Sequence, residues 1–339
     1  MFDLTAKKAF VCDLDGTIFL GGKPIPGAAK FVTDNTKSGR FKFYYLTNNT
    51  SKCPEEYMKK ISGAGIPVEP WQILTPLITL ESYIREKGYK SVYLIASEAV
   101  CAHMRSRFTR DGARESGQFT RDGARESRQG DGACESGQRD GAGESGQRDG
   151  ARESGQFGGA RGYPDSRPPC RVNFDYDPEE NELIALCYDR EVTYEKLANA
   201  CRLWNMRNVP PSQMCPVRTV NQKPVDFVGT HPDNCCPSER GPIPDMGGLM
   251  KLLETTNGMK PSHVFGKPSP TLLAPVLAEF SPGEIAVVGD RLYTDKAIAD
   301  NAGVDFVCVL SGETTREDLI KYTGTPPAIV VETFDKVER

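Results

Sequence analysis

Short apolar runs alternate with helix-forming segments along most of this chain, and this alternation is the strongest constraint on its fold. In the first hundred residues the predicted strands start at residue 9 and cover 41–46 and 91–96, and the predicted helices cover 26–39, 54–64 and 77–87. Strands that alternate with helices form a parallel sheet with helices on both faces. The sequence therefore predicts an α/β fold.

The same alternation returns in the second half of the chain. Predicted strands lie at 182–187, 225–229, 284–288, 305–310 and 328–331. Predicted helices lie at 193–204, 245–254 and 316–322, with another from about 270 to 280. A polar, proline-bearing stretch at 205–224 resembles a second insertion.

A repeat separates the two halves. From residue 105 to 170 there is almost no large apolar side chain, and a unit of the type RDGARESGQ recurs with its Asp at 111, 122, 131, 140 and 149. Nonapeptide repeats can form calcium-binding β-rolls, but those require an apolar residue in each unit. This segment cannot bury enough surface to offset its ordering entropy, so we predict disorder over 105–170. A translated DNA minisatellite or an error in the gene model would produce the same period.

Composition excludes several classes of protein. The net charge of −4 provides no basic field for nucleic acid or for an anionic membrane. No apolar stretch approaches the roughly 20 residues that a membrane span needs, and no apolar signal core precedes the first strand. The 11 cysteines are odd in number and contain no Cys-x-x-Cys, although Cys235 and Cys236 could form a metal or redox pair. We expect a cytoplasmic protein.

Two carboxylates follow the first predicted strand. Asp13 and Asp15 are two residues apart, and side chains at this spacing point to the same side of an extended chain. Carboxylates held together repel each other unless a cation joins them, which favours a hard metal ion such as Mg²⁺. An acidic turn after a strand would give the same sequence.

Other polar residues follow other predicted strands. Thr47 and Asn48 come directly after the strand at 41–46, and Asp290 follows the strand at 284–288. The carboxyl ends of parallel strands line one edge of the sheet, where α/β proteins bind ligands. With Lys267 added after a glycine, these groups suit an oxyanion bridged to Mg²⁺, the requirement of phosphoryl transfer. Each cluster by itself could also be a helix cap or a turn.

The same segments resemble a known family. The sequences DLDGT at 13–17, TN at 47–48, KPSP at 267–270 and GDRLYTD at 289–295 are similar to the four motifs of the haloacid dehalogenase superfamily. The segments GKPIPG at 22–27, LTNNTS at 46–51, TYEKL at 193–197, THPD at 230–233 and LSGETT at 310–315 resemble one branch of its phosphatases. That branch contains nitrophenylphosphatases, phosphoglycolate phosphatases and NagD-like ribonucleotide phosphatases. The resemblance covers about 1–104 and 172–339, without the repeat.

The resemblance implies a role for each motif residue. Asp13 would be the nucleophile that forms an aspartyl-phosphate, and Asp15 would be the general acid and base. Thr47 and Asn48 would hold the transferring phosphoryl group. Lys267 would neutralise that group and orient the nucleophile.

The resemblance also implies a metal site. Asp290 would hold Mg²⁺ together with Asp13 and the backbone carbonyl of Asp15. Asp295 would support the metal site from behind the direct ligands. An acid at position 15 argues against a dehalogenase, because dehalogenases of this superfamily lack it.

Spacing predicts where a lid is inserted. About thirty residues separate Asp15 from Thr47, but more than two hundred separate Thr47 from Lys267. We therefore predict a Rossmann-like parallel-sheet core of the haloacid dehalogenase type at 1–79 and 263–339. An α/β cap domain at 80–262, interrupted by the repeat, would be inserted into it. His231 and Asp233 resemble the substrate-facing segment of the family's cap, although an ordinary proline turn fits them equally well.

The sequence thus predicts a Mg²⁺-dependent phosphomonoester hydrolase. Its substrate would be a small phosphorylated metabolite such as phosphoglycolate, glycerol phosphate, a sugar phosphate or a nucleoside monophosphate, with p-nitrophenyl phosphate as a substrate in vitro. Two copies could pair through the cap, as members of this branch often do. The alternative is a catalytically impaired binding protein whose repeat is a disordered interaction arm.

Overall fold

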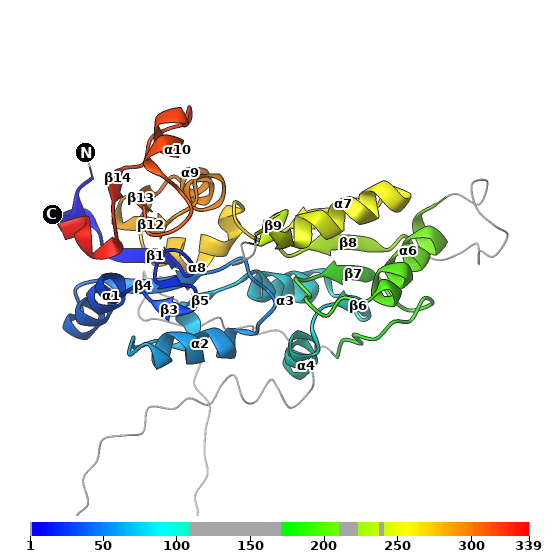
Figure 1. Cartoon of the computed structure of the whole chain (residues 1–339). Coiled ribbons are helices and arrows are strands. Elements are labelled where there is room, and N and C mark those ends of the chain that lie inside the picture. The colour runs from blue at the N-terminus through cyan, green and yellow to red at the C-terminus, as the bar shows by residue number, and fades with distance from the viewer. Residues whose placement is uncertain (1, 109–170, 210–222, 237–240, 339) are drawn as a thin grey trace, which may run out of the picture.

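The computed structural model contains two α/β lobes side by side, with both chain ends in the same lobe (Figure 1). It describes residues 2–108, 171–209, 223–236 and 241–338. We call the lobe around the six-stranded sheet the core lobe and the lobe around the four-stranded sheet the cap lobe. The predicted α/β fold class is confirmed by these sheets.

The core lobe is built on a parallel sheet of order β14-β13-β12-β1-β4-β5. Its strands are β1 (Ala9–Asp13), β4 (Lys42–Leu46), β5 (Ile73–Leu74), β12 (Ile285–Gly289), β13 (Asp305–Val309) and β14 (Ile329–Val331). Its helices are α1 (Pro26–Ser38), α2 (Pro54–Gly63), α8 (Ala274–Leu277), α9 (Ala297–Ala302) and α10 (Arg316–Lys321). A small antiparallel hairpin, β2 (Phe19–Leu20) and β3 (Lys23–Pro24), follows β1.

The cap lobe is built on a sheet of order β11-β8-β7-β6. Its strands are β6 (Val92–Ile95), β7 (Leu183–Leu186), β8 (Asp226–Gly229) and β11 (His263–Val264), and all pairs are parallel. Its helices are α3 (Pro76–Lys87), α4 (Glu98–Arg107), α6 (Tyr194–Asn208) and α7 (Met246–Asn257). The short strands β9 (Cys235–Cys236) and β10 (Ile243–Pro244) form a separate antiparallel pair.

Alternation along β1 explains why both faces of the core sheet are covered. Phe10 and Cys12 point into one apolar cluster with α1 and α2, whereas Ala9 and Val11 point into another with α8 and α9. A buried parallel strand needs apolar residues on both of its faces, which is why the run in β1 is continuous. The cap sheet is covered in the same way, by α3 and α4 on one face and by α6 and α7 on the other.

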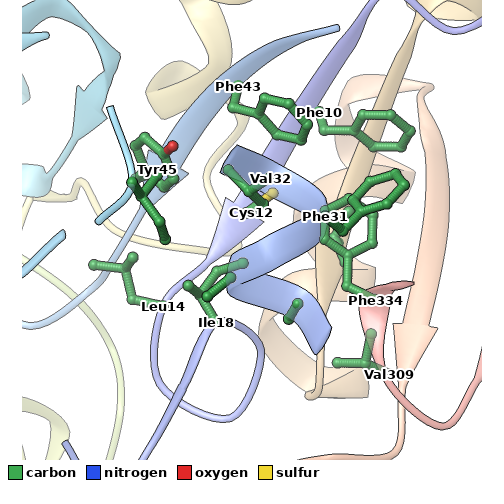
Figure 2. Packing of buried hydrophobic residues seen from close by; sticks show 14 of the residues in the cluster. Phe10, Cys12, Leu14, Ile18, Phe31, Val32, Phe43, Tyr45, Val309 and Phe334 are labelled. Carbon is green, nitrogen blue, oxygen red and sulfur yellow. The ribbon is translucent and has the colours of Figure 1, made fainter. Parts of the chain in front are cut away.

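An aromatic group closes one face of the core lobe. The ring of Phe334 lies 5.2 Å from that of Phe10 and 4.8 Å from that of Phe31, in edge-to-face arrangements (Figure 2). Phe334 begins a 3₁₀ helix, Phe334–Glu338, which fastens the end of the chain against β1 and α1. Edge-to-face aromatic pairs add to the free energy of burial.

Several helix limits follow from local chemistry. Pro26 begins α1, and Gly39 ends it with a φ of 69°, a left-handed conformation that glycine adopts without strain. The segment predicted as one helix to about residue 280 is a 3₁₀ turn, Pro270–Leu273, followed by α8. Its prolines lack the amide hydrogens that a longer helix requires.

The predicted start of the repeat segment, residue 105, was wrong. α4 continues to Arg107, and Phe108 is buried with its ring 5.4 Å from that of Phe174. These residues carry apolar and ion-pairing contacts that the change in composition concealed. The remainder of the repeat, 109–170, lies outside the described residues, as does 210–222 of the predicted second insertion, and α6 extends to Asn208.

The domain limits at 80 and 263 remain predictions. α3 spans the first limit, and its buried apolar residues Leu77, Leu80, Tyr83 and Ile84 lie in a cluster of the cap lobe. His263 and Val264, which we assigned to the core, pair with β8 in the cap sheet. Within the described part of the chain, no helix has the length and apolar character needed to cross a membrane.

The aromatic group generates a stability prediction. Phe334→Ala should lower the free energy of unfolding by about 3–5 kcal/mol, because it removes a fully buried ring and leaves a cavity. Urea denaturation followed by circular dichroism measures this change. The control is Ile320→Ala, which truncates a side chain that is 84% exposed and should change stability by no more than about 0.5 kcal/mol. A loss of under about 1 kcal/mol for Phe334→Ala would contradict the packing.

The residues on either side of 109–170 also generate a prediction. Arg105 donates a hydrogen bond to Asp175 at 2.9 Å, and Phe108 contacts Phe174, so the chain leaves and returns at neighbouring points. Closing such a gap with a short linker costs little entropy. Replacing 109–170 with a short Gly-Ser linker should therefore change the midpoint of thermal unfolding by less than about 4 °C. Loss of soluble protein would show that the segment is needed for folding.

Candidate active site

Three neighbouring strands of the core sheet end at the site. β1 is hydrogen-bonded to β12 on one side and to β4 on the other, all in parallel. Asp13 is the last residue of β1, Asp290 follows β12, and Thr47 follows β4. The predicted meeting of these residues at one edge of the sheet therefore agrees with the strand order.

Lys267 connects the carboxylates of this edge. Its Nζ donates to Asp13 Oδ1 at 2.5 Å and to Asp295 Oδ1 at 2.6 Å. All three residues are buried, with exposed fractions of 3%, 7% and 0% in the order Lys267, Asp13, Asp295. Burial lowers the pKa of Lys267, but the two carboxylates outweigh this effect and the net pKa is raised. The lysine is therefore held as an ammonium ion.

The site carries an excess of negative charge that fits a cation. One carboxylate oxygen from each of Asp13, Asp290 and Asp295 lies within 4.8 Å of the others. Asp290 Oδ1 is buried and has no hydrogen-bond partner among the described residues, while Oδ2 accepts from the Glu313 amide at 2.7 Å. An oxygen-only donor set with an unpaired buried oxygen suits Mg²⁺. The residues present therefore fit the ion that the sequence predicted.

The pKa values of these acids agree with this assignment. Burial and, to a smaller extent, the neighbouring Asp295 raise the pKa of Asp290 to about 6. Burial also raises the pKa of Asp13 well above its usual value, against the opposing effect of Lys267. A bound divalent cation would favour the ionised form of both groups.

Two glycines allow loops to approach Asp290. A Cβ at Gly16 would lie 2.3 Å from Asp290 Oδ2, and a Cβ at Gly312 would lie 1.9 Å from the same atom. Gly16 also has a φ of 97°, which other residues rarely adopt. The Ser311 hydroxyl donates to the Gly16 carbonyl at 2.7 Å and fastens these two loops together. The sequence indicated both segments but no role for either glycine.

The side chain of Asp15 lies outside the three-carboxylate cluster. It is 56% exposed and accepts a hydrogen bond from Lys60 Nζ at 2.7 Å. Strand alternation does not itself relate Asp15 to Asp13, because β1 ends at Asp13 and Asp15 lies in the following turn, so their action on one ligand stays a prediction. Lys60 was not found from the sequence, since it belongs to α2 and to no motif.

Asn48 connects the core lobe to the cap lobe. Its side-chain oxygen accepts from the Lys267 amide at 2.7 Å, and its Nδ2 donates to Asp233 Oδ2 at 3.1 Å. Asp233 of the cap lobe therefore reaches the edge of the core sheet. Thr47 Oγ1 accepts from the Asn49 amide at 3.2 Å, which holds the loop after β4 in a turn.

The structure gives His231 a different environment from that of Asp233. Its ring is 1% exposed, and Nε2 lies 2.9 Å from Asp245 Oδ1. Nδ1 lies 3.3 Å from the hydroxyl of Thr230. A ligand could reach these nitrogens only after both contacts were broken.

A further ion pair lies beside the site. Arg291 Nε is 2.8 Å from Glu313 Oε2, and the hydroxyl of Tyr293 donates to the same carboxylate at 3.2 Å. Tyr293 is 58% exposed. These residues lie in motif segments of the sequence, but their pairing joins two loops and could not be predicted from either one.

Comparison with known proteins identifies the family. A family model described as haloacid dehalogenase-like hydrolase matches residues 10–107, and a second, described as HAD-hydrolase-like, matches 264–337. Both matched segments carry strands that end at the site. The chain belongs to the haloacid dehalogenase-like hydrolases.

Relatives that align over nearly the full length of this chain indicate which branch of the family it resembles. An acid sugar phosphatase of Staphylococcus haemolyticus is 26% identical over 315 residues, which is 92% of this chain and 88% of that protein. The crystal structure of a 4-nitrophenylphosphatase from Thermotoga maritima has a TM-score of 0.67 and 25% identity, and covers 99% of each chain. A solved nagD protein has a TM-score of 0.62 and 26% identity, over 96% of this chain and 97% of its own. The predicted resemblance to the nitrophenylphosphatase and NagD-like branch is confirmed, and the protein is an enzyme of the phosphatase type.

The charge of the site generates a stability prediction. In protein stripped of metal by a chelator, Asp290→Asn should unfold at a higher temperature than the parent, and the difference should grow as the pH rises from about 4 through about 6. Because the pKa of Asp290 is raised in the folded parent, protonation of this group stabilises the folded state. This stabilisation is complete below pH 3.8, the ordinary pKa of aspartate, and is lost as the pH rises through about 6. The variant cannot undergo this loss.

Added Mg²⁺ should reverse that order. At neutral pH it should raise the unfolding temperature of the parent, because it binds only the folded state, and should have little effect on Asp290→Asn. Asp34→Asn, which changes an exposed aspartate of α1, is the matched control and should behave like the parent. Differential scanning fluorimetry at several pH values measures both effects. Parallel curves for the parent and Asp290→Asn would refute the cation site.

Proposed function

We propose that this protein is a Mg²⁺-dependent phosphomonoesterase that acts on a small phosphorylated metabolite through an aspartyl-phosphate. The observation that carries the proposal is the buried contact of Lys267 Nζ with Asp13 Oδ1 inside a cluster of three carboxylates. Phosphoryl transfer depends on positioning and charge neutralisation, and this cluster offers an anionic nucleophile, an ammonium ion and a cation site together.

Asp13 is the nucleophile of the proposed reaction. Lys267 holds its Oδ1, and no described residue donates a hydrogen bond to Oδ2, so Oδ2 is the oxygen available to attack phosphorus. The bond from Oδ2 to phosphorus forms while the bond from phosphorus to the ester oxygen breaks. Bound Mg²⁺, held by Asp13 and Asp290, would neutralise charge on the phosphoryl oxygens.

Asp15 is the proposed general acid and base. Its side chain is more exposed than that of Asp13, so it can reach a leaving oxygen on the solvent side of the site. It donates a proton to the departing alkoxide, then takes one from the water that hydrolyses the aspartyl-phosphate. Lys60 holds the carboxylate of Asp15 in place between these steps.

The remaining residues position the phosphoryl group. Thr47 is the proposed hydroxyl donor to a phosphoryl oxygen. Its Oγ1 accepts from the Asn49 amide, and this bond does not use the hydroxyl hydrogen. Asn48 acts through its bonds to Lys267 and Asp233, which fix the loop and bring the cap lobe to the site. Asp295 holds Lys267 and accepts from the Arg291 amide at 3.1 Å, so both of its oxygens support the site from behind.

The proposed substrate is a small phosphorylated metabolite, and sugar phosphates are the preferred candidates. The relatives named as acid sugar phosphatases and 4-nitrophenylphosphatases support this choice, as does a net charge of −4 that provides no field for nucleic acid. Asp233 is the proposed contact for the leaving group, since it reaches the site from the cap lobe. We do not include His231, whose ring nitrogens are engaged inside the cap lobe.

The proposal includes a reducing compartment and pairing of copies. Of the described cysteines, Cys12, Cys101, Cys187 and Cys308 are buried free thiols, which suits the cytosol. Pairing of two copies through the cap lobe is carried over from the resemblance to this branch of phosphatases.

The test is hydrolysis of p-nitrophenyl phosphate. The parent should release nitrophenolate only with Mg²⁺, and Asp13→Asn should reduce the rate to the metal-free background because it removes the nucleophile. Asp15→Asn should lower kcat by about 10²–10⁴-fold, the usual contribution of a general acid and base. Asp34→Asn, the exposed control, should keep the parental rate. Equal rates for the parent and Asp13→Asn would overturn the proposal.

A further inference from the structure

A second group of metal-ligating side chains lies at the start of α2, apart from the carboxylate cluster. Cys53 precedes the first residue of α2, Glu55 lies in its first turn, and His103 comes from α4. The cysteine sulfur, a carboxylate oxygen and a ring nitrogen of these residues all lie within 4.8 Å of one another. Within this group, His103 Nδ1 lies 3.3 Å from Glu55 Oε2.

This spacing is close to that of a tetrahedral metal site. Bonds of about 2.0–2.3 Å from Zn²⁺ to sulfur, nitrogen and oxygen place neighbouring ligand atoms about 3.3–3.8 Å apart. The three side chains therefore need to close by a small amount only. Three protein ligands would leave a fourth position for water.

The donor set selects a different metal from that of the carboxylate cluster. A thiolate and an imidazole favour borderline ions such as Zn²⁺ or Co²⁺, whereas Mg²⁺ prefers oxygen alone. The ion can enter from solvent, because the side chain of Glu55 is 61% exposed. The two sites therefore differ in chemistry as well as in position.

Capping of α2 does not explain the cysteine. The backbone amide of Cys53 donates to Glu56 Oε2 at 3.0 Å, and the thiol donates to the same oxygen at 3.3 Å. Serine, threonine, aspartate and asparagine are the residues that cap helices well, and a thiol is a weak donor. A serine at this position would cap the helix better, so capping does not explain why the residue is a cysteine.

A metal must displace the proton of the Cys53 thiol, since burial, together with Glu56 and Glu55, raises the pKa of this thiol to about 11. The hydrogen bond from His103 lowers the pKa of Glu55 to about 2, which keeps this carboxylate ionised. One anionic ligand is thus already present.

The position of the group joins the two lobes. α2 packs in the core lobe and α4 packs in the cap lobe. The loop that leads from Thr47 to Cys53 already contacts the cap lobe, since Thr50 Oγ1 accepts from the Tyr188 amide at 2.8 Å and lies 2.9 Å from Thr230 Oγ1. A metal at Cys53 would add a stronger link at the other end of this loop.

We propose that Cys53, Glu55 and His103 bind Zn²⁺ or a similar divalent transition metal, and that the bound ion ties the cap lobe to the core lobe. The ion would hold α4 against the start of α2. The effect on turnover rests on the proposed function: a tied cap slows the opening that product release requires, so the metal inhibits. Binding of the metal itself does not depend on that function.

Co²⁺ titration of the full chain tests the binding. With Mg²⁺ in excess, the parent should develop a thiolate-to-Co²⁺ charge-transfer band in the near ultraviolet. The intensity of this band should saturate at one equivalent of added Co²⁺. Cys53→Ser should lose the band, and it should fold, because serine is a good helix cap. His103→Asn should weaken binding by at least about 100-fold, since the loss of mere outer-shell partners costs about 10–100-fold.

Two control variants assign the band to this site. Cys235→Ser removes another exposed thiol and should keep the band. Asp290→Asn alters the carboxylate cluster and should also keep it. A band that survives Cys53→Ser, that disappears in Cys235→Ser, or that never forms in the parent would overturn the proposed site.

Inhibition by Zn²⁺ tests the tie between lobes. With saturating Mg²⁺, Zn²⁺ should inhibit hydrolysis of p-nitrophenyl phosphate by the parent, and Cys53→Ser should require about 100-fold more Zn²⁺ for the same effect. Equal inhibition of the two proteins would overturn the tie. A chain that forms the Cys53-dependent band but hydrolyses no phosphomonoester would overturn the proposed function and leave the metal site standing.

Discussion

The buried ammonium of Lys267 is the interaction on which the rest of the site depends. It joins Asp13 of β1 to Asp295 of the π-helical turn Leu292–Lys296, although 254 residues of chain separate Lys267 from Asp13. Carboxylates that are buried together repel each other strongly, and removing one partner of a buried ion pair typically costs about 3–5 kcal/mol. The ammonium compensates the cost of burying these acids, and a cation beside Asp290 would complete the neutralisation. The fold can therefore hold Asp13, the proposed nucleophile, buried and in a fixed position.

The connection between the lobes follows from the same lysine. Its amide and carbonyl are both bonded to Asn48, whose Nδ2 also reaches Asp233 of the cap lobe. The loop after β4 is thus fixed at one end by the lysine backbone and in its middle by Thr50, which bonds to Tyr188 and Thr230. Movement of the cap lobe must therefore strain the loop that carries Thr47. In the proposed reaction, movement of the cap lobe and positioning of the phosphoryl group would therefore be coupled through this loop.

Much of this could be predicted from the sequence, because it depends on local patterns. The limits of α1 follow from Pro26 and Gly39, and the meeting of Asp13, Thr47 and Asp290 follows from apolar runs that each end in polar residues. Contacts between distant segments could not be predicted. His231 reads as part of a proline turn, but its burial depends on Asp245, fourteen residues later. Lys60 lies in α2 with no motif around it, and its contact with Asp15 exists only once α2 packs beside β1. The placement of β11 in the cap sheet rests on two residues, too few for any periodicity.

The three-carboxylate cluster and the proposed site at Cys53, Glu55 and His103 differ in their ligand chemistry. Transition metals bind a given set of ligands more tightly than Mg²⁺ does, so an enzyme that works with Mg²⁺ must rely on oxygen ligands, geometry and metal availability to keep them out. The carboxylate cluster follows that rule, since its ligands are all oxygen. Cys53, Glu55 and His103 offer the ligands that zinc prefers, and none of them belongs to the carboxylate cluster. A zinc ion bound there would leave the carboxylate cluster unchanged and would act on the motion between the lobes. Occupancy of the second site would then control the rate of turnover without altering the residues that perform it.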